Sequence, residues 1–229
     1  MRTRSLFANP VAIACTVVAL SAGSASAQAW HYPTLQTPDI STRDFGFLVA
    51  GGGDYGTSAV AQWREGLAPD VMVNFDVGVA TPTDNTMFLA GAGLGYSLMK
   101  ATQETPIDLI ITGGLYGAFG NQSFVRIPVG VVVGHHFPLA GNMVLTPFVS
   151  PRLSVDICAS SCDFIVDNQG DVAHTGTDLK LNFDLGASLD VTKTIGIRAA
   201  LTIGGVSDGN SQTAFGIGLV YRPNMAPRR

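Results

Sequence analysis

Charged residues are scarce in this sequence, and a long apolar run is missing after its first residues. Asp, Glu, Lys and Arg make up 13% of the 229 residues, whereas about a quarter is usual in soluble domains. Hydrophobic residues make up 46%, yet after residue 27 no stretch of ~18 residues lacks polar or charged positions. The scarcity of charge argues against an ordinary water-soluble core. The missing run excludes a helical membrane protein.

The first 27 residues have the three parts of a cleavable signal peptide. Arg2 and Arg4 give a basic start, residues 6–20 are mostly apolar, and residues 25–27 (Ala-Ser-Ala) supply the small side chains of a cleavage site. The apolar stretch is shorter than the roughly 18 to 20 residues that a retained anchor needs. We therefore expect cleavage after Ala27 and export through the periplasm.

Removal of this segment makes the chain more acidic. Of 13 Lys+Arg and 17 Asp+Glu, the segment takes only Arg2 and Arg4, so 11 basic residues face 17 acidic ones and the formal charge is −6. Such a chain repels a phosphate backbone, so nucleic acid is not an expected partner. The remaining residues show no Pro/Ser-rich linker and no shift in composition, which favours one domain.

Apolar residues recur at every second position of the mature chain. The clearest stretch is 178–193, where they alternate with polar, charged or glycine residues. Successive side chains of a strand point to opposite faces, so the pattern predicts a strand with one apolar and one polar face. A helix would spread the charges around its whole circumference. The apolar positions are Leu179, Leu181, Phe183, Leu185, Ala187, Leu189 and Val191.

The same alternation predicts strands along most of the chain. They exceed the usual length of about five or six residues and match the ~9 to 11 residues of a strand that crosses a bilayer. Two shorter candidates, 43–51 and 57–65, decide the strand count, because including both gives ten strands, which we favour, and excluding both gives eight. The other strands are expected at 71–79, 87–99, 107–119, 125–137, 145–157, 195–205 and 213–222.

The polar faces of these strands are rich in glycine and small residues. A soluble sandwich would carry many Lys, Glu and Thr side chains on its polar faces. A small barrel has a narrow interior that needs small side chains and a broad exterior that takes large apolar ones. Lipid offers no partner for backbone groups, so a sheet in a bilayer must close on itself. We predict an all-β protein, a closed antiparallel transmembrane up-and-down β-barrel.

The polar faces would bring charges of both signs into the lumen. Side chains fill the interior of a barrel of eight to ten strands, so opposite charges must pair to avoid a desolvation cost of several kcal/mol. We therefore expect a plugged or very narrow lumen, with Asp44, Asp190 and Arg222 at the rims in water. The expected lumen charges are Arg64, Asp76, Asp108, Arg126, Arg152, Asp156, Lys180, Asp184 and Arg198.

The lengths of the connections predict an orientation. The short connections near 67–69, 101–106, 138–142 and 192–194 are expected on the periplasmic side, and the longest, 158–177, outside. Residues 28–42 are then a periplasmic N-terminal segment, residues 43–223 form the barrel and residues 224–229 form a C-terminal tail.

Two cysteines, Cys158 and Cys162, remain after Cys15 leaves with the signal peptide. In an oxidising compartment this pair predicts a local disulfide in the outer loop. A metal site is the alternative, because His174 and three aspartates share that loop, but no recognised ligand spacing is present. We expect neither a metal nor a cofactor.

The pair His135-His136 invites an acid/base interpretation. It lies at the expected periplasmic end of a strand, where imidazoles also serve as interfacial groups. No Ser or Asp can be assigned beside it from the sequence, so we favour a structural role and name no catalytic residue.

The signal peptide, the repeated alternation and the final strand at 214–222 (AFGIGLVYR) together resemble small outer-membrane barrel proteins of the OmpA/OmpW/opacity-protein type. The resemblance implies a protein of the Gram-negative cell envelope that contacts outer-membrane lipid and lipopolysaccharide and is inserted by the outer-membrane assembly machinery. It implies a structural or surface-interaction protein, or a porin-like narrow conduit for small solutes. The alternative is a barrel enzyme, either lipid A-modifying or an omptin-like protease, because a barrel fold does not determine function.

Overall fold

The computed structural model describes residues 35–51, 57–81, 86–120, 123–160, 176–204 and 212–223, and most of them belong to one β-sheet. Within these ranges no helix is long and apolar enough to cross a membrane. The strands are β1 (Arg43–Gly51), β2 (Thr57–Ala68), β3 (Val71–Thr81), β4 (Met87–Met99), β5 (Asp108–Phe119), β6 (Ser123–Gly134), β7 (Phe137–Pro138), β8 (Val144–Ser160), β9 (Gly176–Asp190), β10 (Ile195–Gly204) and β11 (Gln212–Tyr221).

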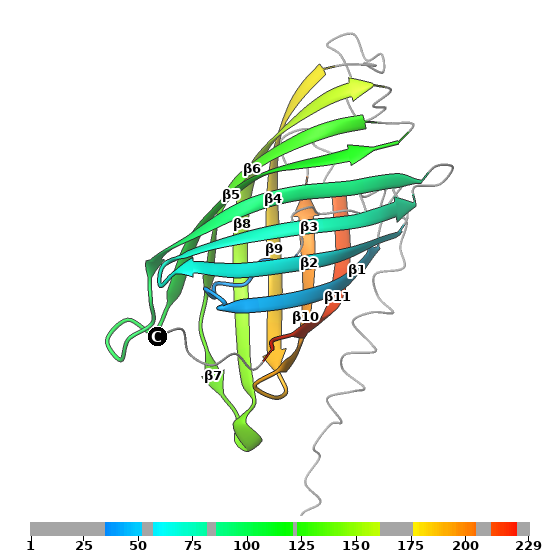
Figure 1. Ribbon diagram of the computed structural model, residues 1–229. Helices are drawn as coiled ribbons and strands as arrows, with labels where there is room; N and C mark the ends of the chain where they lie inside the picture. Colours follow the sequence, from blue (N-terminus) through cyan, green and yellow to red (C-terminus); the bar gives the residue numbers. More distant parts are fainter. Residues whose placement is uncertain are drawn as a thin grey trace, which may run out of the picture.

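The sheet closes on itself into a barrel (Figure 1). Neighbouring strands pair antiparallel, with β1 beside β11 and β6 beside β8. The two-residue β7 pairs with β8 just beyond β6, so β6 and β7 are two parts of one strand, interrupted at His135 and His136. The candidates 43–51 and 57–65 are β1 and β2. The predicted closed ten-stranded antiparallel barrel is therefore confirmed, and the eight-stranded alternative is wrong.

The alternation in the sequence becomes an inside and an outside of the barrel. In β1 the side chains of Asp44, Leu48 and Ala50 are buried, whereas Phe45 and Phe47 between them are exposed. Exposed large hydrophobic side chains come from every one of the ten strands, so the apolar surface runs around the whole barrel. Soluble proteins rarely expose an apolar patch larger than a few hundred Å². Hydrocarbon tails are the environment that this exterior fits.

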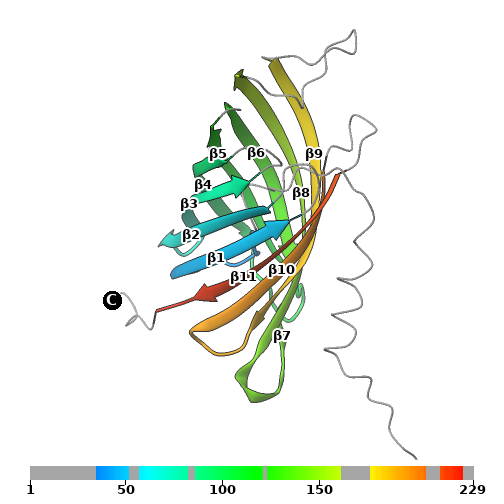
Figure 2. The ribbon, with the colours of Figure 1, turned by 90° about the vertical axis from the view of Figure 1, so that its right-hand side faces the viewer.

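The two ends of the barrel differ in their connections. We call one end the turn end; its connections are residues 69–70, 100–107, 139–143 and 191–194, and it is the lower end in Figures 1 and 2. The connections at the opposite end, the loop end, lie largely outside the described residues. In the turn before β8, Gly141 has φ = 75°, a conformation that glycine adopts without a steric penalty. All the short connections expected from the sequence are at the turn end.

A charge placed on the outer face should destabilise the barrel according to its depth. Ile217 lies in the middle of β11 and is 50% exposed. We expect Ile217→Arg to lower the free energy of unfolding in lipid vesicles by about 2 to 4 kcal/mol, because the midplane of a bilayer disfavours arginine most. Tyr221→Arg, at the end of the same strand, should cost about 1 kcal/mol or less. Equal effects in urea titrations would contradict a membrane-spanning β11.

Candidate functional site

The chain before β1 lies inside the barrel. Residues 36–38 are buried, and Leu35 packs against Val132 of β6, Phe148 of β8 and Ala200 of β10, which come from separate parts of the wall. At the turn end the carbonyl of Thr42 accepts a hydrogen bond from the Gly66 amide (3.1 Å) just before β1 begins. The described part of the segment expected at 28–42 thus fills the lumen instead of lying outside it. Its polar residues have partners on the wall, which composition alone could not reveal.

Side chains from several strands hold this N-terminal segment. Thr37 Oγ1 accepts a hydrogen bond from Arg64 Nη1 (3.0 Å), and Gln36 hydrogen-bonds to Tyr116. Asp39 Oδ1 lies 2.8 Å from His136 Nε2. The segment therefore acts as a plug, and from here on we refer to residues 35–42 as the plug.

Beside the plug, one carboxylate pairs with two buried guanidinium groups. Arg64 donates from Nε to Asp44 Oδ1 (2.9 Å) and from Nη2 to Oδ2, and Arg198 Nη2 donates to the same Oδ2 (3.1 Å). All three side chains are almost fully buried. Asp44 was expected at the rim in water, and that expectation is wrong. It stands opposite Arg64 in the β1–β2 register, with its side chain on the inner face.

A second set of ion pairs fills the lumen nearer the loop end. Arg126 on β6 donates to both carboxylate oxygens of Asp156, its partner in the β6–β8 register (2.7 and 2.6 Å). Lys180 Nζ lies 3.4 Å from Asp178 and 3.9 Å from Asp156. Arg152 pairs with Asp184 (2.7 Å), which also accepts a hydrogen bond from Thr202 (2.6 Å). At the turn end, by contrast, Arg222 and Asp190, the other two residues expected at a rim, pair with each other while half-buried (2.6 Å).

Asp76 lies among neutral polar groups, and the charge of Arg64 also acts on it. Asn74 Nδ2 donates to Asp76 Oδ2 (3.2 Å) and to the hydroxyl of Tyr116 (2.9 Å), and Gln62 also hydrogen-bonds to Asp76. The Tyr116 ring lies over glycines of the neighbouring strand, because a Cβ added at Gly93 would be 2.4 Å from the Tyr116 hydroxyl. The glycines on this face make room for an aromatic ring in the lumen.

The turn end of the lumen contains a half-buried histidine between two carboxylates. His136 Nε2 lies 2.8 Å from Asp39 and 3.3 Å from Asp108, while Nδ1 lies 2.8 Å from the Thr146 hydroxyl. The hydrogen bond to Asp39 raises the pKa of His136 above its ordinary value, and nearby carboxylates add to the rise against partial burial. Burial acts to raise the pKa of Asp39, but the hydrogen bond and charge of His136 lower it overall. Sequence analysis had found no acidic partner, because Asp39 and Asp108 are distant in the chain.

A hydroxyl, an imidazole and a carboxylate in contact are the components of a nucleophilic triad. Thr146 is only 2% exposed, however, so its hydroxyl has no access for a substrate. The other histidine, His135, packs edge-on against the Phe137 ring (4.3 Å between ring centroids). The geometry of His136 therefore fits the fastening of the plug better than catalysis.

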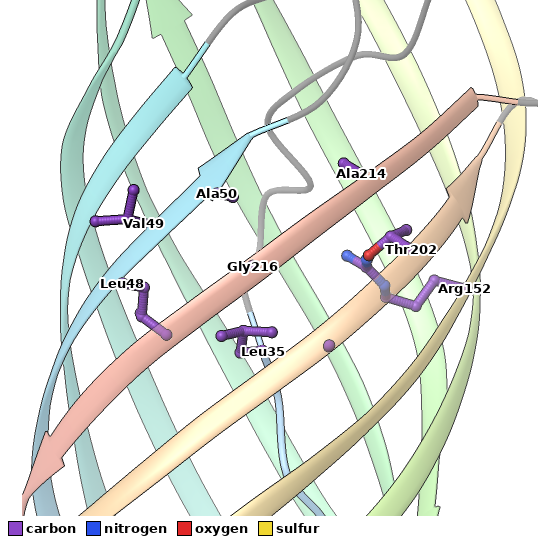
Figure 3. A pocket seen from close by; sticks show the side chains of 9 residues that line it. Leu35, Leu48, Val49, Ala50, Arg152, Thr202, Ala214 and Gly216 are labelled. Atoms are coloured by element: carbon purple, nitrogen blue, oxygen red, sulfur yellow. The ribbon is translucent and has the colours of Figure 1, made fainter. Parts of the chain in front are cut away.

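Above the plug, toward the loop end, the lumen contains a small cavity. Leu48 of β1, Arg152 of β8 and Thr202 of β10 converge around it with Leu35 (Figure 3). Its volume of about 20 Å³ is room for about one water molecule. Within the described residues, no group of three or more His, Cys, Asp or Glu could hold a metal ion. Cys158 is disulfide-bonded, while Cys162 and the expected metal alternative at His174 lie outside the described residues.

No protein-family model matches the chain, and no curated protein matches it. Among solved structures, LpxR from Salmonella typhimurium has a TM-score of 0.47 at 7% identity, covering 78% of this chain and 99% of that one. The beta domain of the Bordetella autotransporter Brka has a TM-score of 0.49 at 8% identity, covering 79% and 98%. The KdgM porin has a TM-score of 0.39 at 10% identity, covering 79% and 99%. These likenesses assign no activity to the chain.

Removal of the shared carboxylate should destabilise the barrel strongly. Asp44→Asn leaves Arg64 and Arg198 buried without a counter-charge, so we expect a loss of about 3 to 5 kcal/mol of unfolding free energy in lipid vesicles. The control is Asp70→Asn, which breaks the exposed pair with Lys100 and should cost about 1 kcal/mol or less. Similar losses for both variants would show that the buried charges are hydrated.

Replacement of a glycine under Tyr116 should displace the ring. We expect Gly93→Ala to cost about 1 to 3 kcal/mol and to weaken the Asn74–Tyr116 hydrogen bond, because the new methyl group overlaps the hydroxyl. At Gly113, by contrast, a Cβ would be 3.7 Å from its nearest neighbour, so Gly113→Ala is the matched control. Thermal unfolding followed by near-UV dichroism of tyrosine measures both effects, and an unchanged Tyr116 signal in Gly93→Ala would contradict the packing.

Proposed function

We propose that this chain is a non-enzymatic protein of the Gram-negative outer membrane, with a closed lumen and a structural or surface-interaction role. The observation that carries the proposal is the filled interior. Ion pairs, neutral polar side chains and the plug occupy the lumen, and the cavity above the plug has room for about one water molecule. These groups leave little room for a polar solute among the residues that the structure describes.

Three features support the outer membrane as the location. The apolar exterior needs lipid, the closed sheet leaves no unpaired edge, and residues 1–27 read as a signal peptide for export. The resemblance to the OmpA/OmpW/opacity-protein type agrees with this location. Contact with outer-membrane lipid and lipopolysaccharide and insertion by the assembly machinery would follow from it. The pairing of Cys158 with Cys162 in the outer loop is part of the same proposal.

The enzyme alternative has one observation in its favour, the contact of His136 with Asp39 and Thr146. The burial of Thr146 argues against it. Lipid A analysis and a peptide-cleavage assay on cells that express the chain would detect such an activity. We expect no change in either.

Conductance tests the proposal directly. We expect the full chain, purified from outer membranes and inserted into planar bilayers at about pH 6, to show no stable open level, because the plug and ion pairs fill the lumen. Membrane fractionation of the same cells should place the chain with outer-membrane markers. A steady conductance at this pH, or recovery in the detergent-free soluble fraction, would contradict the proposal.

A further inference from the structure

The plug fills part of the lumen but does not belong to the strands of the barrel wall. Residues 35–42 belong to no strand, and the only backbone hydrogen bond that the described structure shows for them is from Gly66 to Thr42. The ion pairs elsewhere join strands to one another, so they stay in place if the plug leaves.

The plug and the cavity above it together span most of the lumen. The plug reaches from Thr42 at the turn end to Leu35, which also lines the cavity. The cavity is bordered by Ala50, Thr202 and Ala214, which lie close to the loop-end termini of β1, β10 and β11. Withdrawal of the plug would join the turn end to this cavity.

The positive charge that joins the plug to the wall at the turn end comes from one proton on His136. A neutral ring can still donate from Nε2 to Asp39 and accept from the Thr146 hydroxyl, but it carries no charge. A protonated His136 donates from Nε2 to Asp39 on the plug and from Nδ1 to Thr146 on β8, with Asp108 on β5 3.3 Å from Nε2. Once the ring is neutral, the carboxylates of Asp39 and Asp108 face each other with no positive charge between them. Like charges at such a distance repel each other.

The other charged groups around His136 do not take the place of its positive charge. Asp190, at the end of β9, acts on His136 and is itself paired with Arg222, which follows β11. Arg64 of β2 and Arg198 of β10 attract Asp39, because the single carboxylate of Asp44 leaves one of their two positive charges unbalanced, but the ion pair that the described structure shows for Asp39 is with His136. The charge balance between the plug and β5 therefore depends on His136.

We propose that the plug is releasable, and that its withdrawal converts the barrel into a conduit for inorganic ions and small polar solutes, with His136, Asp39 and Asp108 as the latch. This inference rests on the proposed closed lumen. The vacated path is the space that residues 35–42 now occupy, which suits ions and small polar solutes but not folded polymers. Its walls offer polar groups, among them Gln62, Asn74 and Arg64.

The direction of the pH response follows from the pKa of His136, which lies above its ordinary value in the closed barrel. The latch is therefore complete below the ordinary histidine pKa of about 6.5 and is lost as pH rises through the raised value. The conduit is closed in mild acid and opens in alkaline solution.

Planar-bilayer recordings in KCl test this response on the full chain. We expect the fraction of open time to rise severalfold between about pH 6 and pH 9, because His136, whose pKa is raised by its hydrogen bond to Asp39, loses its proton in that range. The variant His136→Gln should be as open at pH 6 as at pH 9, because it has no charge to lose. His135→Gln removes a histidine that packs on Phe137, and it should keep the response of the natural chain.

A variant of Asp108 distinguishes repulsion between the Asp39 and Asp108 carboxylates from a general destabilisation of the barrel. Asp108→Asn should open less at pH 9 than the natural chain, because the neutral ring then faces only one carboxylate. Heat-modifiable migration on gels establishes that each variant is folded. An Asp108→Asn barrel that opens more at pH 9 would overturn the latch.

A covalent lock tests the movement of the plug itself. A Cβ built at Gly216 of β11 lies 3.7 Å from Leu35 Cδ2 and meets no atom closer than 3.5 Å, so Leu35→Cys with Gly216→Cys brings two thiols near each other without a clash. The oxidised double variant should stay closed at pH 9, and a reductant should restore opening. The natural chain treated with reductant is the control, because Cys158 is also disulfide-bonded.

The outcomes distinguish this inference from the proposed function. Steady conductance at both pH values would overturn the closed lumen and the plug together. Silence at both values, also when residues 35–39 are replaced by a Gly-Ser stretch, would overturn the plug and leave the closed barrel intact.

Discussion

A buried charge without a partner is too costly to keep, and in this barrel that constraint acts from both sides of the wall. Outside, hydrocarbon accepts only apolar side chains, so charged residues such as Arg64, Arg126 and Arg198 point inward. Inside, a lumen of ten strands has too little water to hydrate them, so Arg64 and Arg198 share Asp44 and Arg126 pairs with Asp156. These ion pairs link strands through their side chains, in addition to the hydrogen bonds between their backbones.

The plug extends the same logic to a segment outside the sheet. Its residues are partners for polar side chains of the wall, since Thr37 accepts a hydrogen bond from Arg64 and Asp39 pairs with His136. The same contacts therefore fill the lumen and hold the plug in place. The latch differs from the other contacts in that its cation, an imidazole, can lose its charge near physiological pH. A guanidinium at the same place would hold the plug permanently.

Sequence reasoning reached the architecture because a two-residue period and the demand for closure in lipid leave few alternatives. It also selected the inward faces, since alternation assigns each residue a side. The sequence alone did not show which charged residues pair with each other. Alternation puts Asp44 on the inner face but does not show which residue lies opposite it, and only the β1–β2 register sets it opposite Arg64. His136 was left without an acidic partner because Asp39 and Asp108 meet it only across the lumen.

By itself, then, the sequence determined that this chain makes a membrane barrel of long two-faced strands with charge on the inside. Period and hydropathy are local properties, and a bilayer translates them into a fold with little ambiguity. Only the tertiary structure decided that residues 35–42 lie in the lumen and which charges share which partners. Those features depend on register, tilt and the coming together of residues far apart in the chain, and none of these is written in a local pattern.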